Sequence, residues 1–135
     1  MLNKQKNIFV IIIRVRSYTV NIDSTVFYSN DINNVVDFYR DIIGLTVEYQ
    51  QSDKYVSFLF ENGVRLGIKR AAEEREIPGA QTIFIASNDI EILYEKFQRR
   101  GVIISKELQL NDGFGLNFSI LDPDNNKVQF VDRNS

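Results

Sequence analysis

One four-residue sequence occurs twice in this chain. Ser29-Asn30-Asp31-Ile32 returns unchanged as Ser87-Asn88-Asp89-Ile90, 58 positions later. Each copy follows a short apolar run that favours a strand and precedes an apolar pattern at helical spacing that ends at a glycine, Gly44 or Gly101. Because the capping residues, the helical spacing and the final glycine recur together, we interpret the two segments as an internal duplication of one strand, turn and helix unit.

The composition agrees with two such units in one globular domain. The chain has 135 residues, of which 44% are hydrophobic and 25% are charged, and its formal net charge is -2. A nucleic-acid-binding surface is normally basic, so we expect no nucleic-acid partner. The chain contains neither cysteine nor histidine, which excludes disulfides and thiolate metal sites and removes the commonest metal ligand and general base.

Residues 1–23 lie outside the duplication. Their apolar run from Ile8 to Ile13 superficially resembles a secretion signal, but it is too short to span a membrane, and Arg14 and Arg16 follow it. The many β-branched residues favour one or two extra strands at a sheet edge or a subunit interface, with a disordered start as the alternative. We therefore expect a cytoplasmic protein without a membrane partner.

The first unit is expected over residues 24–70. A strand over residues 24–29 is followed by a helix that begins at Asn30 or Asp31 and ends at Gly44, because Asn and Asp cap helices well and glycine tolerates the left-handed conformation. Asn62-Gly63 predicts a primed hairpin turn between two strands. Three strands are expected after the helix, at about residues 45–51, 55–60 and 64–69.

The second unit is expected over residues 81–135, after a linker at residues 71–80. We expect the three glutamates of this linker, Glu73, Glu74 and Glu76, to be solvated. The second helix is followed by strands at about residues 102–108, 115–121 and 127–132, and the turn Asp122-Pro123-Asp124-Asn125-Asn126 joins the last two. The sequence thus predicts an α+β protein of two βαβββ modules, each with strands packed on one helix.

These residues resemble the vicinal oxygen chelate superfamily of glyoxalases, bleomycin-resistance proteins and extradiol dioxygenases. The resemblance covers residues 24–133 and rests on VFYSNDINNVVDFYRDIIGL, its second copy, and the closing LDPDNNKVQFVDR. It implies two βαβββ modules whose strands form a curled mixed sheet around a cleft, with the helices on the outer face.

The resemblance also implies four metal-ligand positions, which the metal-dependent members fill with His or Glu. They fall on Ser24, Thr82 and Gln129, and on either Arg65 or Gly67. Two hydroxyls, an amide and a guanidinium or a bare glycine cannot neutralise a divalent ion. We therefore expect no metal and no other cofactor, and we name no catalytic residue.

The alternation of side chains along the strands instead predicts a small-molecule pocket. Aromatic faces and scattered hydrogen-bonding groups on the inward side are typical of such sites, and Arg65 with Lys127 could receive an anionic group or simply reach solvent at the rim. The candidate ligand-binding residues are Ser24, Tyr28, Tyr55, Ser57, Arg65, Thr82, Phe84, Asn117, Lys127 and Gln129.

Together these features favour a metal-independent ligand-binding protein that sequesters an antibiotic or metabolite, similar to the bleomycin-resistance branch. That similarity implies a homodimer with clefts shared between subunits. Two alternatives stay open at this point: a lyase or dioxygenase-like enzyme with a non-standard site, in which Tyr28 or Tyr55 could act as an acid, and a protein-interaction module with a vestigial cleft.

Overall fold

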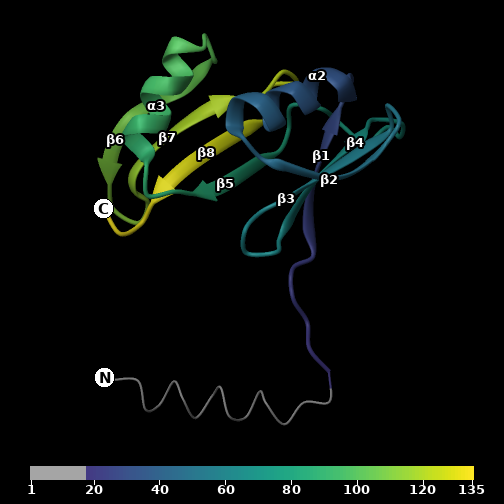
Figure 1. The fold of residues 1–135 in the computed structure, drawn as a ribbon, viewed down its shortest axis with the longest axis horizontal. Coiled ribbons are helices and arrows are strands. Elements are labelled where there is room, and N and C mark those ends of the chain that lie inside the picture. Colours follow the sequence, from purple (N-terminus) through teal and green to yellow (C-terminus); the bar gives the residue numbers. More distant parts are fainter. Residues whose placement is uncertain (1–17) are drawn as a thin grey trace.

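A computed structural model describes residues 18–135 (Figure 1). Residues 18–23 form neither helix nor strand, and the first strand begins at Ser24. The remainder of the predicted N-terminal strand region, residues 1–17, lies outside the described residues. None of the helices between residues 18 and 135 has the length and apolar character needed to cross a membrane.

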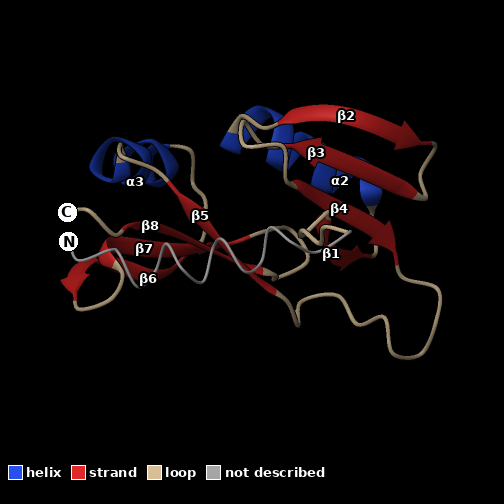
Figure 2. Cartoon of the chain, turned by 90° about the horizontal axis from the view of Figure 1, so that it is seen from below, coloured by secondary structure: helices blue, strands red, loops and turns tan. Residues whose placement is uncertain are grey.

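The first module consists of β1 (Ser24–Ser29), α2 (Ile32–Asp37), the π-helical turn η1 (Phe38–Ile43), β2 (Thr46–Gln51), β3 (Tyr55–Leu59) and β4 (Arg65–Arg70). Its sheet has the order β1-β4-β3-β2, with β1 parallel to β4 and the other pairs antiparallel. Figure 2 shows these four strands with α2 behind them.

The second module repeats this arrangement. It consists of β5 (Thr82–Ala86), α3 (Ile90–Arg99), β6 (Ile104–Asn111), β7 (Gly115–Leu121) and β8 (Lys127–Asp132), and its sheet has the order β5-β8-β7-β6 with β5 parallel to β8. The predicted α+β class with two βαβββ modules is therefore confirmed. The modules lie side by side, the second at the left and the first at the right of Figure 1.

The first helix differs in form from the prediction. Asp31 caps it by accepting a hydrogen bond from the backbone N–H of Asn34 at 3.2 Å, and it ends at Gly44 in the left-handed conformation, with φ 93°. Between these points the α-helix widens into a π-helix, in which the Tyr39 carbonyl accepts from both Gly44 and Leu45. Phe38 and Tyr39, adjacent in sequence, are both buried in this wider turn.

Each sheet buries one face against its helix. In the first module the face toward α2 carries Phe27, Val56, Phe58, Leu66 and Ile68, all fully buried. In the second module Phe97 of α3 packs on Phe118 and Phe130, with ring centroids 6.0 and 5.4 Å apart. Because alternate residues of a strand point to opposite faces, the other face of each sheet is left for binding.

The turn between β3 and β4 corrects one prediction. Gly63 has a positive φ of 88°, but Asn62 does not, so the turn is not of the two-residue primed type. The Phe60 N–H donates to the Val64 carbonyl, and the Phe60 carbonyl accepts from the Gly63 N–H, which closes a longer loop. Asn125 in the matching turn of the second module has φ 69°, the left-handed position predicted for an asparagine there.

The segment between the modules corrects the prediction that all three of its glutamates are solvated. Glu73 and Glu74 are exposed, but Glu76 is buried and accepts hydrogen bonds from Lys69 Nζ at 2.6 Å and from the backbone of Ala72 and Glu73. The bond from Lys69 and the two backbone N–H groups lower the pKa of Glu76 to about 2. Glu76 therefore orders this segment as an ionised carboxylate.

A group of hydrogen bonds joins the two modules through the turn between β7 and β8. The Tyr39 hydroxyl donates to Asp122 Oδ2 at 2.7 Å, and Ser29 Oγ and the Asn30 N–H donate to Asp124 at 2.5 and 3.0 Å. Asn126 Nδ2 donates to the Tyr28 carbonyl at 3.2 Å. The Asp-Pro-Asp-Asn-Asn turn thus fastens the start of β8 to the first strand and helix.

Candidate functional site

The candidate binding residues all lie on the sheet faces that point away from the helices. The strand register shows this directly. Val26 of β1 pairs with Gly67 of β4, and Phe84 of β5 pairs with Gln129 of β8. Each of these residues is next in sequence to a residue that faces the helix, so its own side points to the opposite face of the sheet. The residues divide evenly between the sheets: Ser24, Tyr28, Tyr55, Ser57 and Arg65 on the first, and Thr82, Phe84, Asn117, Lys127 and Gln129 on the second.

Polar interactions do not link the two sets to one another in the described part of the chain. No hydrogen bond or ion pair among residues 18–135 joins a member of the first set to a member of the second. Tyr28 comes nearest, because its backbone N–H donates to Gln81 Oε1 at 3.2 Å and its carbonyl accepts from Asn126. Each sheet therefore presents its own half of the predicted site.

On the first sheet Arg65 is already paired. Glu48 accepts from Arg65 Nε at 2.6 Å and from Nη2 at 3.0 Å, and Asp23 lies 3.5 Å from Nη1. The hydrogen bond from Arg65 lowers the pKa of Glu48, and the same bond raises the pKa of Arg65. Ser57 Oγ also donates to Glu48, at 3.3 Å. The guanidinium is thus largely neutralised before any ligand binds.

Sequence reasoning left Glu48 out because no residue of β2 was included in the candidate set, although alternation from Val47, which faces the core, places Glu48 on the open face. The register of β2 against β3 shifts between Val47 and Tyr49, which places two consecutive residues, Glu48 and Tyr49, opposite Ser57. Strict alternation anticipates the face of Glu48 but not this bulge, which no residue in TVEYQQ marks.

A second feature of the first sheet is the pairing of Gly67 with Tyr55. A Cβ added at Gly67 would overlap the Tyr55 hydroxyl, so this phenol occupies the space that a side chain at residue 67 would take. The register identifies Gly67 as the counterpart of Gln129, because each lies two residues into the last strand and opposite the third residue of the first strand. If Gln129 holds the fourth of the implied ligand positions, Gly67 and not Arg65 is its counterpart in the first module.

The second sheet carries amides and hydroxyls instead of an ion pair. Gln129 Nε2 donates to Asn117 Oδ1 at 3.3 Å, and Asn117 Nδ2 donates to the Gly115 carbonyl at 2.8 Å and to Asn111 Oδ1 at 3.1 Å. Both Asn117 and Gln129 are buried. Beside them, Phe84 is 46% exposed and lies 5.3 Å from the ring of Phe114.

The four positions to which the family resemblance assigns metal ligands do not fit a divalent ion here. Ser24 and Thr82 offer neutral hydroxyls, Gly67 offers no side chain, and Gln129 offers an amide already bonded to Asn117. The described part of the chain also contains no group of three or more Asp, Glu, His or Cys side chains that could hold an ion. Neutral oxygens without a carboxylate or imidazole bind such ions poorly.

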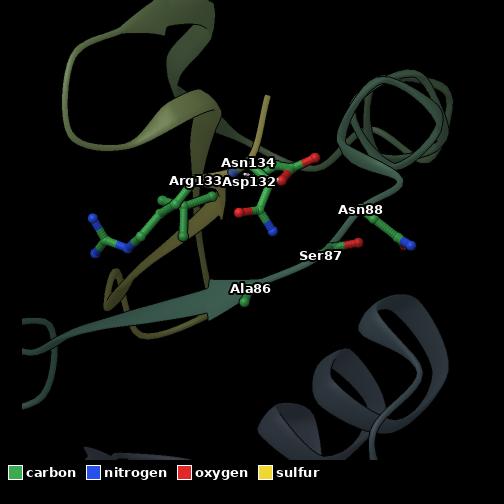
Figure 3. A pocket seen from close by; sticks show the side chains of 7 residues that line it. Ala86, Ser87, Asn88, Asp132, Arg133 and Asn134 are labelled. Carbon is green, nitrogen blue, oxygen red and sulfur yellow. Dashed lines mark hydrogen bonds between the residues drawn. The ribbon is translucent and has the colours of Figure 1, made fainter. Parts of the chain in front are cut away.

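Two cavities lie at the end of the second sheet where β5 and β8 finish and the β6–β7 turn lies. The larger, of about 580 Å³, is lined by Ala86, Ser87 and Asn88 and by residues 131–134 (Figure 3). The smaller, of about 430 Å³, lies between the β6–β7 turn and the C-terminal residues. None of the ten candidate binding residues lines either of these two cavities.

Comparison with known proteins identifies the fold family. Residues 21–130 match the family model described as Glyoxalase/Bleomycin resistance protein/Dioxygenase superfamily. A search of curated proteins gives no match.

Solved structures with the same fold include a lactoylglutathione lyase from Agrobacterium tumefaciens, 19% identical, with a TM-score of 0.71 over 85% of this chain and 95% of the other. They also include TnmS3, an antibiotic binding protein from Streptomyces sp. CB03234, 16% identical, with a TM-score of 0.73 over 87% and 98%. TioX from Micromonospora sp. ML1 is 14% identical, with a TM-score of 0.69 over 84% and 99%.

At these identities the structural likeness establishes the fold and leaves the activity open. The family model spans most of the chain, and the observed βαβββ modules are the architecture that the sequence resemblance implied. The chain belongs to the Glyoxalase/Bleomycin resistance protein/Dioxygenase superfamily.

Proposed function

We propose that this protein binds a small organic molecule without metal and without transforming it, and so sequesters an antibiotic or metabolite in the cytoplasm. The observation that carries the proposal is the residue set at the four metal-ligand positions: Ser24, Gly67, Thr82 and Gln129. The side chains of Ser24, Thr82 and Gln129 can donate or accept hydrogen bonds and Gly67 has no side chain, so the set cannot activate a water or polarise a carbonyl as a bound ion would.

The composition of the two faces supports ligand binding. The exposed ring of Phe84 and the half-buried ring of Phe114, together with the hydrogen-bonded amides of Asn117 and Gln129, combine apolar surface with a few fixed polar groups. Since Glu48 already pairs with Arg65, we expect the site to accept uncharged ligands. TnmS3, an antibiotic binding protein with this fold, provides a precedent for such binding.

A homodimer is part of the proposal. The two sets of candidate residues lie on separate sheets, so a complete pocket requires the first sheet of one subunit to face the second sheet of its partner. Exposed apolar side chains on these faces, Val26 at 39% and Phe84 at 46%, provide area that such an arrangement would cover.

Ligand binding can be tested with metal-free bleomycin and a panel of other antibiotics, by thermal shift followed by calorimetry. We expect saturable stabilisation by at least one compound, with loss of binding in Phe84→Ala and in Gln129→Leu. Ile92→Ala, which changes an exposed residue on the outer face of α3, is the matched control. Recovery of a chemically altered compound after incubation would instead support the enzyme alternative.

A further inference from the structure

The duplication carries one further inference, which concerns the segment after the first strand of each module. In the first module this segment binds a carboxylate. Ser29 Oγ accepts a hydrogen bond from the Asp31 N–H at 3.0 Å and donates its own hydrogen to Asp124 Oδ2, while the Asn30 N–H donates to Asp124 Oδ1. Two uncharged donors thus hold both oxygens of one carboxylate, and no basic side chain among the described residues bonds to it.

The second module has the same four residues and repeats one of the hydrogen bonds. Ser87 Oγ accepts from the Asp89 N–H at 3.1 Å, as Ser29 does from Asp31. Its hydrogen is therefore available to donate, and among residues 18–135 neither Ser87 Oγ nor the Asn88 N–H has an acceptor. Ser87 and Asn88 instead border the 580 Å³ cavity.

We propose that this cavity is a carboxylate-binding site, in which Ser87 Oγ and the Asn88 N–H each donate to one oxygen of a carboxylate, as Ser29 and Asn30 do to Asp124. The supporting observation is the internal repeat: the same tetrapeptide binds a carboxylate in one module and borders a cavity in the other. The site is separate from the proposed pocket, since none of the candidate binding residues lines it.

The charged side chains that line the cavity, Asp132 and Arg133, are already bonded to other groups. Ser87 Oγ and the Asn88 N–H are therefore the donors that would recognise a carboxylate. Figure 3 shows Ser87 and Asn88 on one side and Asp132, Arg133 and Asn134 on the other, with the Arg133 guanidinium pointing away from Ser87. Arg133 donates to the Gly113 carbonyl at 2.6 Å and lies over the Phe114 ring, and Asp132 Oδ1 accepts from the Asn134 N–H. Binding by two neutral donors in an open cavity is weak, with a Kd on the order of 1–10 mM.

The test is an amide-detected NMR titration of the full chain with two carboxylate probes. One is N-acetyl-aspartate methylamide, and the other is a peptide of residues 121–127, the turn that occupies the first module. We expect both probes to shift the Asn88 amide resonance in a saturable way and to leave that of Asn30 unchanged. The matched uncharged control is N-acetyl-asparagine methylamide, which should bind at least fivefold more weakly.

Variants separate this site from a general anion effect. Ser87→Ala should weaken binding at least fivefold, Ser87→Thr should restore it because the hydroxyl remains, and Arg133→Gln should leave it unchanged. An intact amide spectrum of Ser87→Ala shows that the fold persists. Equal response to the asparagine probe, no shift at Asn88, or a loss of binding in Arg133→Gln with none in Ser87→Ala would each overturn the proposal.

Discussion

The hydroxyl of Tyr55 lies where the side chain of residue 67 would begin. In the second module the corresponding pair is Asn117 and Gln129, where the last-strand residue is long and its neighbour is short. The equivalent space on the open face is therefore filled by a residue of β3, Tyr55, in the first module and by a residue of β8, Gln129, in the second. In the first module a phenol occupies the space beside Gly67.

This relationship predicts that Gly67→Ala destabilises the protein. The added methyl group would overlap the Tyr55 hydroxyl, so the half-buried tyrosine side chain must shift, and we expect a loss of up to about 1 kcal/mol of unfolding free energy. Urea denaturation measures the change. Because Tyr55→Phe removes the nearest atom, the double variant should recover part of the loss, and strictly additive effects would show that the two residues are not coupled.

The Tyr39–Asp122 bond predicts a second effect. Tyr39→Phe removes a buried donor at 2.7 Å from Asp122 Oδ2, so we expect a loss of about 1–3 kcal/mol, with Tyr94→Phe as a control that removes a hydroxyl on the second helix. A change below about 0.5 kcal/mol would mean that the bond between the modules contributes little.

The same bond predicts a loss of stability in alkali. Burial, followed by the Asp122 carboxylate, raises the pKa of Tyr39 well above its usual value. A raised folded pKa gives stability that is present below the unfolded pKa and is lost as the pH rises past it, since only the unfolded phenol then ionises. Above about pH 10, wild type should therefore lose stability faster than Tyr39→Phe, and parallel curves would contradict this.

Glu76 predicts the opposite dependence in acid. Its folded pKa of about 2 lies below the ordinary glutamate value, so its contribution is present above pH 4.5 and is lost as the pH falls toward 2. Glu76→Gln should show a shallower fall in unfolding free energy over this range than wild type, whereas Glu74→Gln, at an exposed position, should follow wild type. Identical slopes for all three proteins would refute the account of this segment.

Comparison of sequence and structure shows which features were accessible from the chain alone. The repeated Ser-Asn-Asp-Ile sequence and the final glycines located both helices, and alternation placed all ten candidate residues on the open faces, because both patterns depend on local periodicity. Glu48 was left out because the candidate set included no residue of its strand. Glu76 escaped prediction because its partners, Lys69 and two backbone N–H groups, come together only through the fold of a non-repetitive segment. The Tyr55 hydroxyl occupies the space beside Gly67 only because β3 and β4 pair in one particular register. The spacing of residues in the sequence does not reveal that register.

The central claim, that binding needs no metal, is tested most directly by elemental analysis of the purified protein together with a thermal-shift series in Zn²⁺, Ni²⁺, Mn²⁺, Fe²⁺ and EDTA. A bound ion would stabilise the folded state by mass action. We predict less than stoichiometric metal and no saturable increase in Tm with any ion, and no decrease with EDTA. A stoichiometric ion whose removal lowers Tm would contradict the account and would favour a metal-dependent enzyme built on a ligand set other than Ser24, Gly67, Thr82 and Gln129.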